Sequence, residues 1–243
     1  MSAALPGHCG TSHGTAARSN NQARQPFLHI EVLDRLMQGL GVTATGAPLG
    51  RMVIPQELLD TCDADIGKAF LADIGPRAAS APLLGGLRLS ELAEAFQTIL
   101  WHEAAASNAV LLQRRADSID PQVRARLERG QHVSAAELAE ARQLQAYLTK
   151  GMALRLNAGD VAVFPTLPVT PPQVNAAPNE FDRFRQRIIA LTCLSGLTGW
   201  PQLVLPRDAS APTQSISLLS PARTDRLLLD FANRLSVSTP EKL

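Results

Sequence analysis

Apolar residues recur at three- and four-residue spacing over much of the chain, a pattern that predicts amphipathic helices. The clearest runs extend from Phe27 to Gly41, from Ser90 to about Ser118, and onward from Ser134. Ser134 and Glu137 have the spacing of a capping box, in which each side chain accepts a hydrogen bond from the other residue's backbone N–H. Further helices are expected at about 63–74, 120–130, 181–197 and 224–236.

Short apolar segments of a different kind stand between these helices. They are expected to be strands at Arg51–Pro55, Val161–Phe164, Gln202–Leu205 and Ile216–Leu219, whereas Ala78–Leu89 is expected to be a connection. Strands that alternate with helices are typical of a sheet that buries its faces under helices. The sequence therefore predicts an α/β fold with a mixed sheet covered by helices.

The first 26 residues differ from the rest of the chain. They are rich in Gly, Ser, Thr, Asn and Ala and show no apolar periodicity. Such a segment buries too little apolar surface to offset the entropy lost on ordering. We expect residues 1–26 to form a disordered or loosely ordered tail, followed by a domain at 27–243.

Composition narrows the function classes. The chain has 23 basic and 22 acidic residues, a net charge of +1, so no overall field favours nucleic acid or an acidic membrane. No apolar run approaches the ~20 residues of a membrane span. Cys9, Cys62 and Cys193 are odd in number and far apart, without metal-ligand spacing. These features predict a cytoplasmic protein with reduced thiols and no metal site.

The segment Phe181–Pro206 carries the most specific pattern. A helix leads into the turn Leu197–Pro201, and the apolar strand Gln202–Leu205 follows at once. Glycine permits the tight reversal, and proline is tolerated where a strand begins. Upstream lies Asp160–Pro168, and downstream lies Ser215–Leu229.

This ordered set resembles the C-terminal half of the amidase signature family, from the helix near Ile30 to the helix ending near Leu235. The turn before Pro201 is similar to the family's Asn-x-x-Gly-x-Pro turn, although Ser195 and Trp200 depart from its commonest residues. The resemblance implies that residues 27–243 form the C-terminal portion of an amidase-like domain.

The resemblance also implies an activity. Members of the family cleave carboxylic amides with a Ser, cis-Ser and Lys triad, without a metal or organic cofactor. This chain has no Ser-Ser pair, and its lysines, Lys68, Lys150 and Lys242, fall on no predicted strand. In relatives the catalytic serine lies in a loop rich in Gly and Ser. Gly10–Gly14 is the segment most similar to that loop, but it lies within the expected tail. We assign no catalytic residue.

Candidate substrate-binding residues come from the same resemblance. Family segments that border the acyl-binding pocket correspond here to Thr166, Leu167, Pro168, Val169 and Trp200; the alternative is that these are core and turn residues. His102 and Glu103 are interpreted as helix-surface or interhelix polar residues, since neighbours in a helix do not face each other. Cys193 is interpreted as a small buried apolar residue.

Three functions remain open. The first is a truncated or degenerate amidase-family hydrolase, inactive alone, whose complete relatives act on small carboxylic amides. The second is the C-terminal part of a split amidase that needs a separate N-terminal chain. The third is a non-catalytic interaction scaffold. Half of a shared sheet leaves strand edges and apolar surface uncovered, so we expect a partner chain or self-association.

Overall fold

A computed structural model describes residues 26–42, 48–205 and 215–237. The expected tail, residues 1–26, lies outside the described part except for Pro26. Helical elements in chain order are α1 (Pro26–Gly39), α2 (Gln56–Leu59), α3 (Ala64–Ile74), η2 (Gly75–Arg77), α4 (Leu89–Ser107), α5 (Ala109–Arg115), η3 (Ala116–Ser118), α6 (Pro121–Gln131), α7 (Ala135–Ala153), α8 (Pro178–Thr198) and α9 (Asp225–Val237). The strands are β1 (Met52–Pro55), β2 (Ala79–Ala81), β3 (Val161–Pro165), β4 (Gln202–Leu205) and β5 (Ile216–Leu219).

The strands form one mixed sheet in the order β2-β1-β3-β5-β4. Strands β2, β1 and β3 run parallel, whereas β5 is antiparallel to both β3 and β4. Parallel neighbours need crossover connections: α2 and α3 lie between β1 and β2, and the long helical segment α4–α7 lies in the connection that leads from β1 to β3. The predicted α/β class with a mixed sheet is confirmed.

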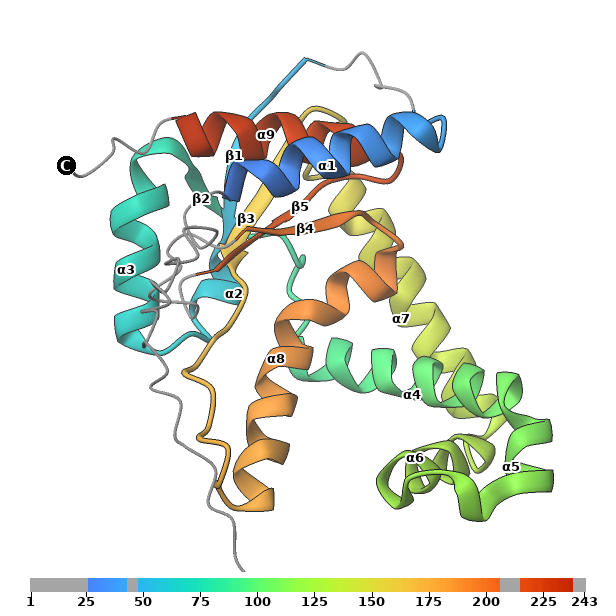
Figure 1. Cartoon of the computed structure of the whole chain (residues 1–243). Coiled ribbons are helices and arrows are strands. Elements are labelled where there is room, and N and C mark those ends of the chain that lie inside the picture. The colour runs from blue at the N-terminus through green and yellow to red at the C-terminus, as the bar shows by residue number, and fades with distance from the viewer. Residues whose placement is uncertain (1–25, 43–47, 206–214, 238–243) are drawn as a thin grey trace, which may run out of the picture.

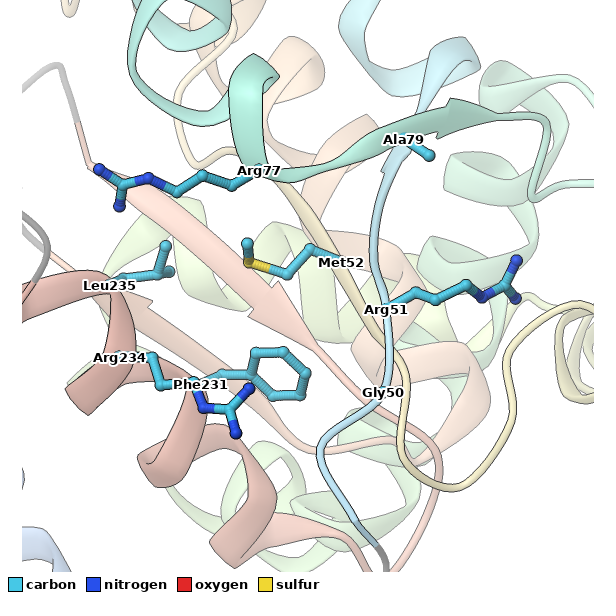
Figure 2. A pocket seen from close by; sticks show the side chains of 8 residues that line it. All are labelled: Gly50, Arg51, Met52, Arg77, Ala79, Phe231, Arg234 and Leu235. Carbon is cyan, nitrogen blue, oxygen red and sulfur yellow. The ribbon is translucent and has the colours of Figure 1, made fainter.

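Helices cover both faces of the sheet (Figure 1). Alternate residues of β3 point to opposite faces, as in any strand. Phe164 belongs to the cluster formed with α4, α7 and α8, whereas Val163 belongs to the cluster formed with α1, α3 and α9. All five β3 residues are buried, which agrees with its nearly continuous apolar sequence.

Helix starts follow the sequence signals closely. Ser134 and Glu137 form the expected capping box at the start of α7. The Asp120 carboxylate accepts hydrogen bonds from the N–H groups of Gln122 and Val123 at the start of α6. Asp63 occupies the N-cap position of α3, but its side chain makes no capping bond there.

Two elements differ from the sequence prediction. The helix expected from Ser90 to about Ser118 is interrupted at Asn108, whose Nδ2 donates to the Ala104 carbonyl oxygen at 2.8 Å. That side-chain bond takes part in ending α4 although the apolar pattern continues beyond it. The expected connection Ala78–Leu89 contains the three-residue edge strand β2.

Asp160 fastens the entrance of β3 to the entrance of β1. Asp160 is 3% exposed, and its carboxylate accepts bonds from the Arg51 N–H and guanidinium, both at 2.9 Å. It also accepts bonds from the Asn157 N–H at 3.1 Å and side-chain amide at 3.2 Å. Burial by itself would raise the pKa of Asp160, but the bonds from Arg51 and Asn157 outweigh it, so the pKa lies below its ordinary value.

Replacing the carboxylate should therefore weaken the fold in a pH-dependent way. Asp160→Asn should lower the free energy of unfolding at pH 7 by ~2 kcal/mol. The asparagine amide keeps one acceptor oxygen, but its NH₂ group would face the N–H donors of Arg51 and Asn157 and could not accept from them. A lowered folded-state pKa stabilises the protein above the unfolded pKa of about 3.9, and this contribution is lost as the pH falls through the folded-state pKa.

Urea unfolding at pH 7, 5 and 3 measures the effect, and the difference between wild type and Asp160→Asn should shrink at pH 3. Asp117→Asn is the control, because Asp117 is fully exposed and its pairing with Arg124 is a surface contact at 3.4 Å. A difference that is the same at all three pH values would contradict the assignment.

Gly130 allows α6 to approach α4 closely. A Cβ at this position would lie 2.6 Å from the carbonyl carbon of Trp101 and 2.9 Å from the Cβ of Ala105, both in α4. The backbone of α4 cannot yield as a flexible side chain could. The helix expected at about 120–130 is thus present, with Gly130 at its contact with α4.

Gly130→Ala should destabilise the protein by at least ~1–3 kcal/mol, the usual cost of overpacking. Gly39→Ala is the matched control, because a Cβ there meets nothing within 4 Å and alanine favours the helix. Thermal unfolding of both variants tests the contact. Equal midpoints for the two variants would rule it out.

Candidate functional site

The segment after β3 contains four of the five predicted site residues and is tied to its surroundings by hydrogen bonds. The Thr166 N–H donates to the Ser215 carbonyl oxygen at 2.9 Å, and the Thr166 and Ser217 hydroxyls lie 3.0 Å apart. The Pro168 carbonyl oxygen accepts a bond from the Asp63 N–H at 2.8 Å. Pro168 and Val169 are buried and Leu167 is half-buried. The segment is thus held against both β5 and the start of α3.

Pro168 lines a hollow of about 560 Å³, which we call the Pro168 hollow. This volume lies within the range of ordinary small-molecule sites. The hollow lies between the α2–α3 turn, the start of α4 and the middle of α8. The lining residues are Thr61, Leu89, Ser90, Ala93, Glu94, Gln97, Pro168, Gln186, Arg187 and Ala190.

Arg187 connects two walls of the Pro168 hollow. Its Nη2 donates to the Thr61 carbonyl oxygen at 2.7 Å and to the Asp63 carboxylate at 3.1 Å. The same Asp63 binds Pro168 through its backbone, so α8, the α2–α3 turn and the post-β3 segment form one connected rim. This pairing explains why Asp63 does not cap its own helix with its side chain.

The chemistry available in the Pro168 hollow is binding chemistry. Ser90, Gln97 and Gln186 offer neutral hydrogen-bonding groups, and Glu94 adds a carboxylate. Neither histidine nor lysine is among the lining residues, so the two side chains that most often activate a serine hydroxyl do not line the hollow. The hollow can orient a polar molecule against an apolar wall.

Trp200 does not line the Pro168 hollow and lies in the apolar core, just after the C-terminal end of α8. It is 4% exposed, and its carbonyl oxygen accepts a bond from the Ser195 hydroxyl at 2.9 Å. Gly199 has φ +67°, a left-handed conformation that glycine adopts without strain. The structure thus confirms the glycine reversal, and it does not bring Trp200 together with Pro168 in this hollow.

Sequence reasoning did not single out the α4 residues of the hollow. The spacing of Ser90, Ala93, Glu94 and Gln97 shows that they share one face of a helix. The sequence does not show which other segments pack against that face.

The remaining chemical candidates have ordinary structural roles. Glu103 of α4 lies 3.8 Å from Arg142 of α7, an interhelix polar contact as predicted. Lys68 and Lys150 are exposed on helices. Cys193 is fully buried, and burial raises the pKa of its thiol to about 12, which makes it a poor nucleophile. Lys242, Cys9 and Gly10–Gly14 lie outside the described residues.

Within residues 26–42, 48–205 and 215–237, no group of three or more His, Cys, Asp or Glu side chains could hold a metal ion. Over the same part of the chain, every helix is too short or too polar to cross a membrane.

Comparison with known proteins gives a consistent result. Amidase 1 of Arabidopsis thaliana is 23% identical over 150 residues, which make up 61% of this chain and 35% of that protein. The crystal structure of an amidase superposes with a TM-score of 0.63 at 19% identity and covers 81% of this chain and 47% of its own. A bacterial aryl acylamidase of the amidase signature family gives a TM-score of 0.54 at 14% identity, with 81% and 45% coverage. No family model matches.

These similarities show an amidase fold over most of the described chain. The chain resembles the amidase signature family in part, which confirms the resemblance inferred from its motifs. It spans less than half the length of each of these relatives.

The rim of the Pro168 hollow can be tested through one amide proton. Arg187→Gln should speed hydrogen exchange at the Asp63 N–H, because loss of the guanidinium frees the turn that presents this N–H to Pro168. Arg183→Gln is the control, since Arg183 is also exposed on α8 but does not line the hollow. Exchange measured by NMR at Asp63 should change in the first variant alone; an equal effect of both would refute the connection.

Proposed function

We propose that this chain supplies the C-terminal portion of an amidase-type hydrolase and forms one wall of its amide-binding site. The observation that carries the proposal is the fold similarity, which includes four-fifths of this chain and under half of a solved amidase. The motif order from Asp160 to Leu229 supports its assignment to the C-terminal half. Residues 27–243 act as one unit in this proposal.

Amide hydrolysis needs an activated nucleophile and donors that stabilise the oxyanion. A lysine acts as a base when burial lowers its pKa, yet Lys68 and Lys150 are both exposed. Neither lysine lines the Pro168 hollow, so neither can exchange a proton with a serine there. The described residues therefore bind substrate in this proposal, and the reacting groups come from a complementary N-terminal part.

The Pro168 hollow is the proposed wall for a small carboxylic amide. The rings of Pro165 and Pro168 fix their φ angles, and the bonds from Thr166 and Asp63 hold the segment in place. Gln97 and Gln186 can exchange hydrogen bonds with the amide group, and Ala93 and Ala190 can pack against its acyl chain. Hydrolysis by such a site uses no metal or organic cofactor. Trp200 supports the site from the core.

The complementary part is proposed to add to the sheet. Strands β2 and β4 form the two edges of the described sheet, and Val204 of β4 is 47% exposed. An unpaired edge offers its N–H and C=O groups to a further strand. The partner is therefore a polypeptide rather than nucleic acid or membrane, and the free thiols of Cys62 and Cys193 suit a cytoplasmic location.

Two alternatives differ in where the reacting groups reside. In a split amidase, a separate chain carries them and activity returns on assembly. In an interaction scaffold, the open edges bind a partner but no hydrolysis follows. The absence of a buried lysine among the described residues favours either of these over activity of the chain by itself.

Amide hydrolysis by the purified chain tests the proposal directly. The 243-residue chain should release no ammonia from acetamide or benzamide above the buffer rate. Co-expression with a neighbouring reading frame that encodes a serine loop and a lysine should yield a complex that hydrolyses at least one of them. A Gln186→Ala, Gln97→Ala double variant of that complex should raise KM at least tenfold.

Three outcomes decide between the alternatives. Ammonia release by the chain alone overturns the proposal. A stable but inactive complex favours the scaffold. Activity with an unchanged KM in the double variant removes the Pro168 hollow from the substrate site.

A further inference from the structure

A second hollow, of about 740 Å³, lies between α6 and the first turns of α8. We call it the arginine groove, because Arg126 and Arg129 of α6 and Arg185 of α8 line it. It shares no lining residue with the Pro168 hollow. It therefore has no part in the function proposed above.

The arginine groove has an excess of positive charge. Three guanidinium groups and one carboxylate, that of Asp182, line it, so three positive charges against one negative leave two in excess. Arginines remain protonated at all physiological pH values, so this excess is permanent. A hollow lined mainly by one sign of charge concentrates the field and attracts ions of the opposite sign.

The three arginines of the groove make no ion pair with any residue in the described ranges. Arg124, on the same helix, shows the contrast, since it pairs with both Asp117 and Glu128. Arg129 lies over the Trp101 ring, 5.0 Å from its centroid. A cation–π contact holds the guanidinium in place while its N–H groups keep their capacity to donate.

The groove also has an apolar wall. Phe181 is 40% exposed there, and Pro178 and Ala125 lie beside it among the lining residues. Exposed aromatic surface next to guanidinium groups suits a ligand that has both an apolar body and an anionic end. The volume is that of a site for a small molecule.

We propose that the arginine groove binds a small organic anion, in which a carboxylate or phosphate is carried on an apolar body. The oxyanion lies between Arg126, Arg129 and Arg185, whose planar forks match two oxygens at once. The apolar body packs on Phe181. Asp182 weakens the binding by repelling the anion.

Calorimetric titration of the full chain tests the site with four probes: benzoate, phenyl phosphate, inorganic phosphate and benzyl alcohol. Benzoate or phenyl phosphate should bind saturably with one site per chain, and whichever binds more tightly identifies the oxyanion. Arg126→Gln and Arg185→Gln should each weaken binding about tenfold or more, as expected for a lost charge-assisted hydrogen bond. Asp182→Asn should strengthen it.

Arg183→Gln is the matched control, because it removes the same charge from the same helix outside the groove, and binding should stay within twofold of wild type. Circular dichroism melts establish that each variant is folded. The proposal would be overturned if benzyl alcohol or inorganic phosphate bound as tightly as the better of benzoate and phenyl phosphate. It would also be overturned if Arg183→Gln weakened binding as much as Arg126→Gln or Arg185→Gln does, or if no probe bound saturably.

Discussion

Burial of β3 on both faces is the constraint on which the rest of the structure depends. Residues 161–164 of this strand alternate between two apolar clusters, with Phe164 on the side of α4, α7 and α8 and Val163 on the side of α1, α3 and α9. The strand also pairs with β1 on one edge and β5 on the other. A shift of one residue in its register would exchange the two faces and disrupt both clusters. The two bonds from Arg51 to Asp160 fix that register against β1 at the strand's entrance.

The candidate site follows from this fixed frame. The chain leaves β3 through Thr166 and Pro168, so the position of the strand determines where the Pro168 hollow can form. Helix α8 then passes the hollow at Arg187 and ends in the core near Trp200. One helix thus connects a solvent-accessible wall to a buried turn. A binding surface at the middle of α8 and a rigid anchor at its C-terminal end agree with the proposed role of the chain as a substrate wall.

Local signals explain which parts of the fold could be predicted from the sequence. The helix starts at Asp120 and Ser134 were predictable because their caps are made within three residues. The strand at 161–165 was predictable from its apolar run. The strand β2 was missed because Ala79–Ala81 contains no β-branched or aromatic residue. The break at Asn108 was missed because the apolar pattern continues across it and the Asn108 side-chain bond to Ala104 leaves no trace in that pattern.

The site was less predictable for a physical reason. Pro168 was predicted as a site residue through a family resemblance and stays a prediction, whereas Arg187 looked like any exposed arginine on a helix. Its partners, Thr61 and Asp63, are 126 and 124 residues away in the chain, and no local pattern reports such a contact. The arginine groove was missed likewise, because the charges of two helices become one site only when the helices pack.

The position of the helical segment between β2 and β3 has a consequence for how the chain folds. Arg51 and Asp160 lie 109 residues apart, so joining β1 to β3 in an otherwise unfolded chain closes a long loop at a large entropic cost. Helix α4 packs against both α6 and α7, which are closer to it in sequence than β1 is to β3. If these helices form first, they draw the two strand segments together and shorten the effective loop. The route of assembly then runs from the helical insertion to the parallel sheet.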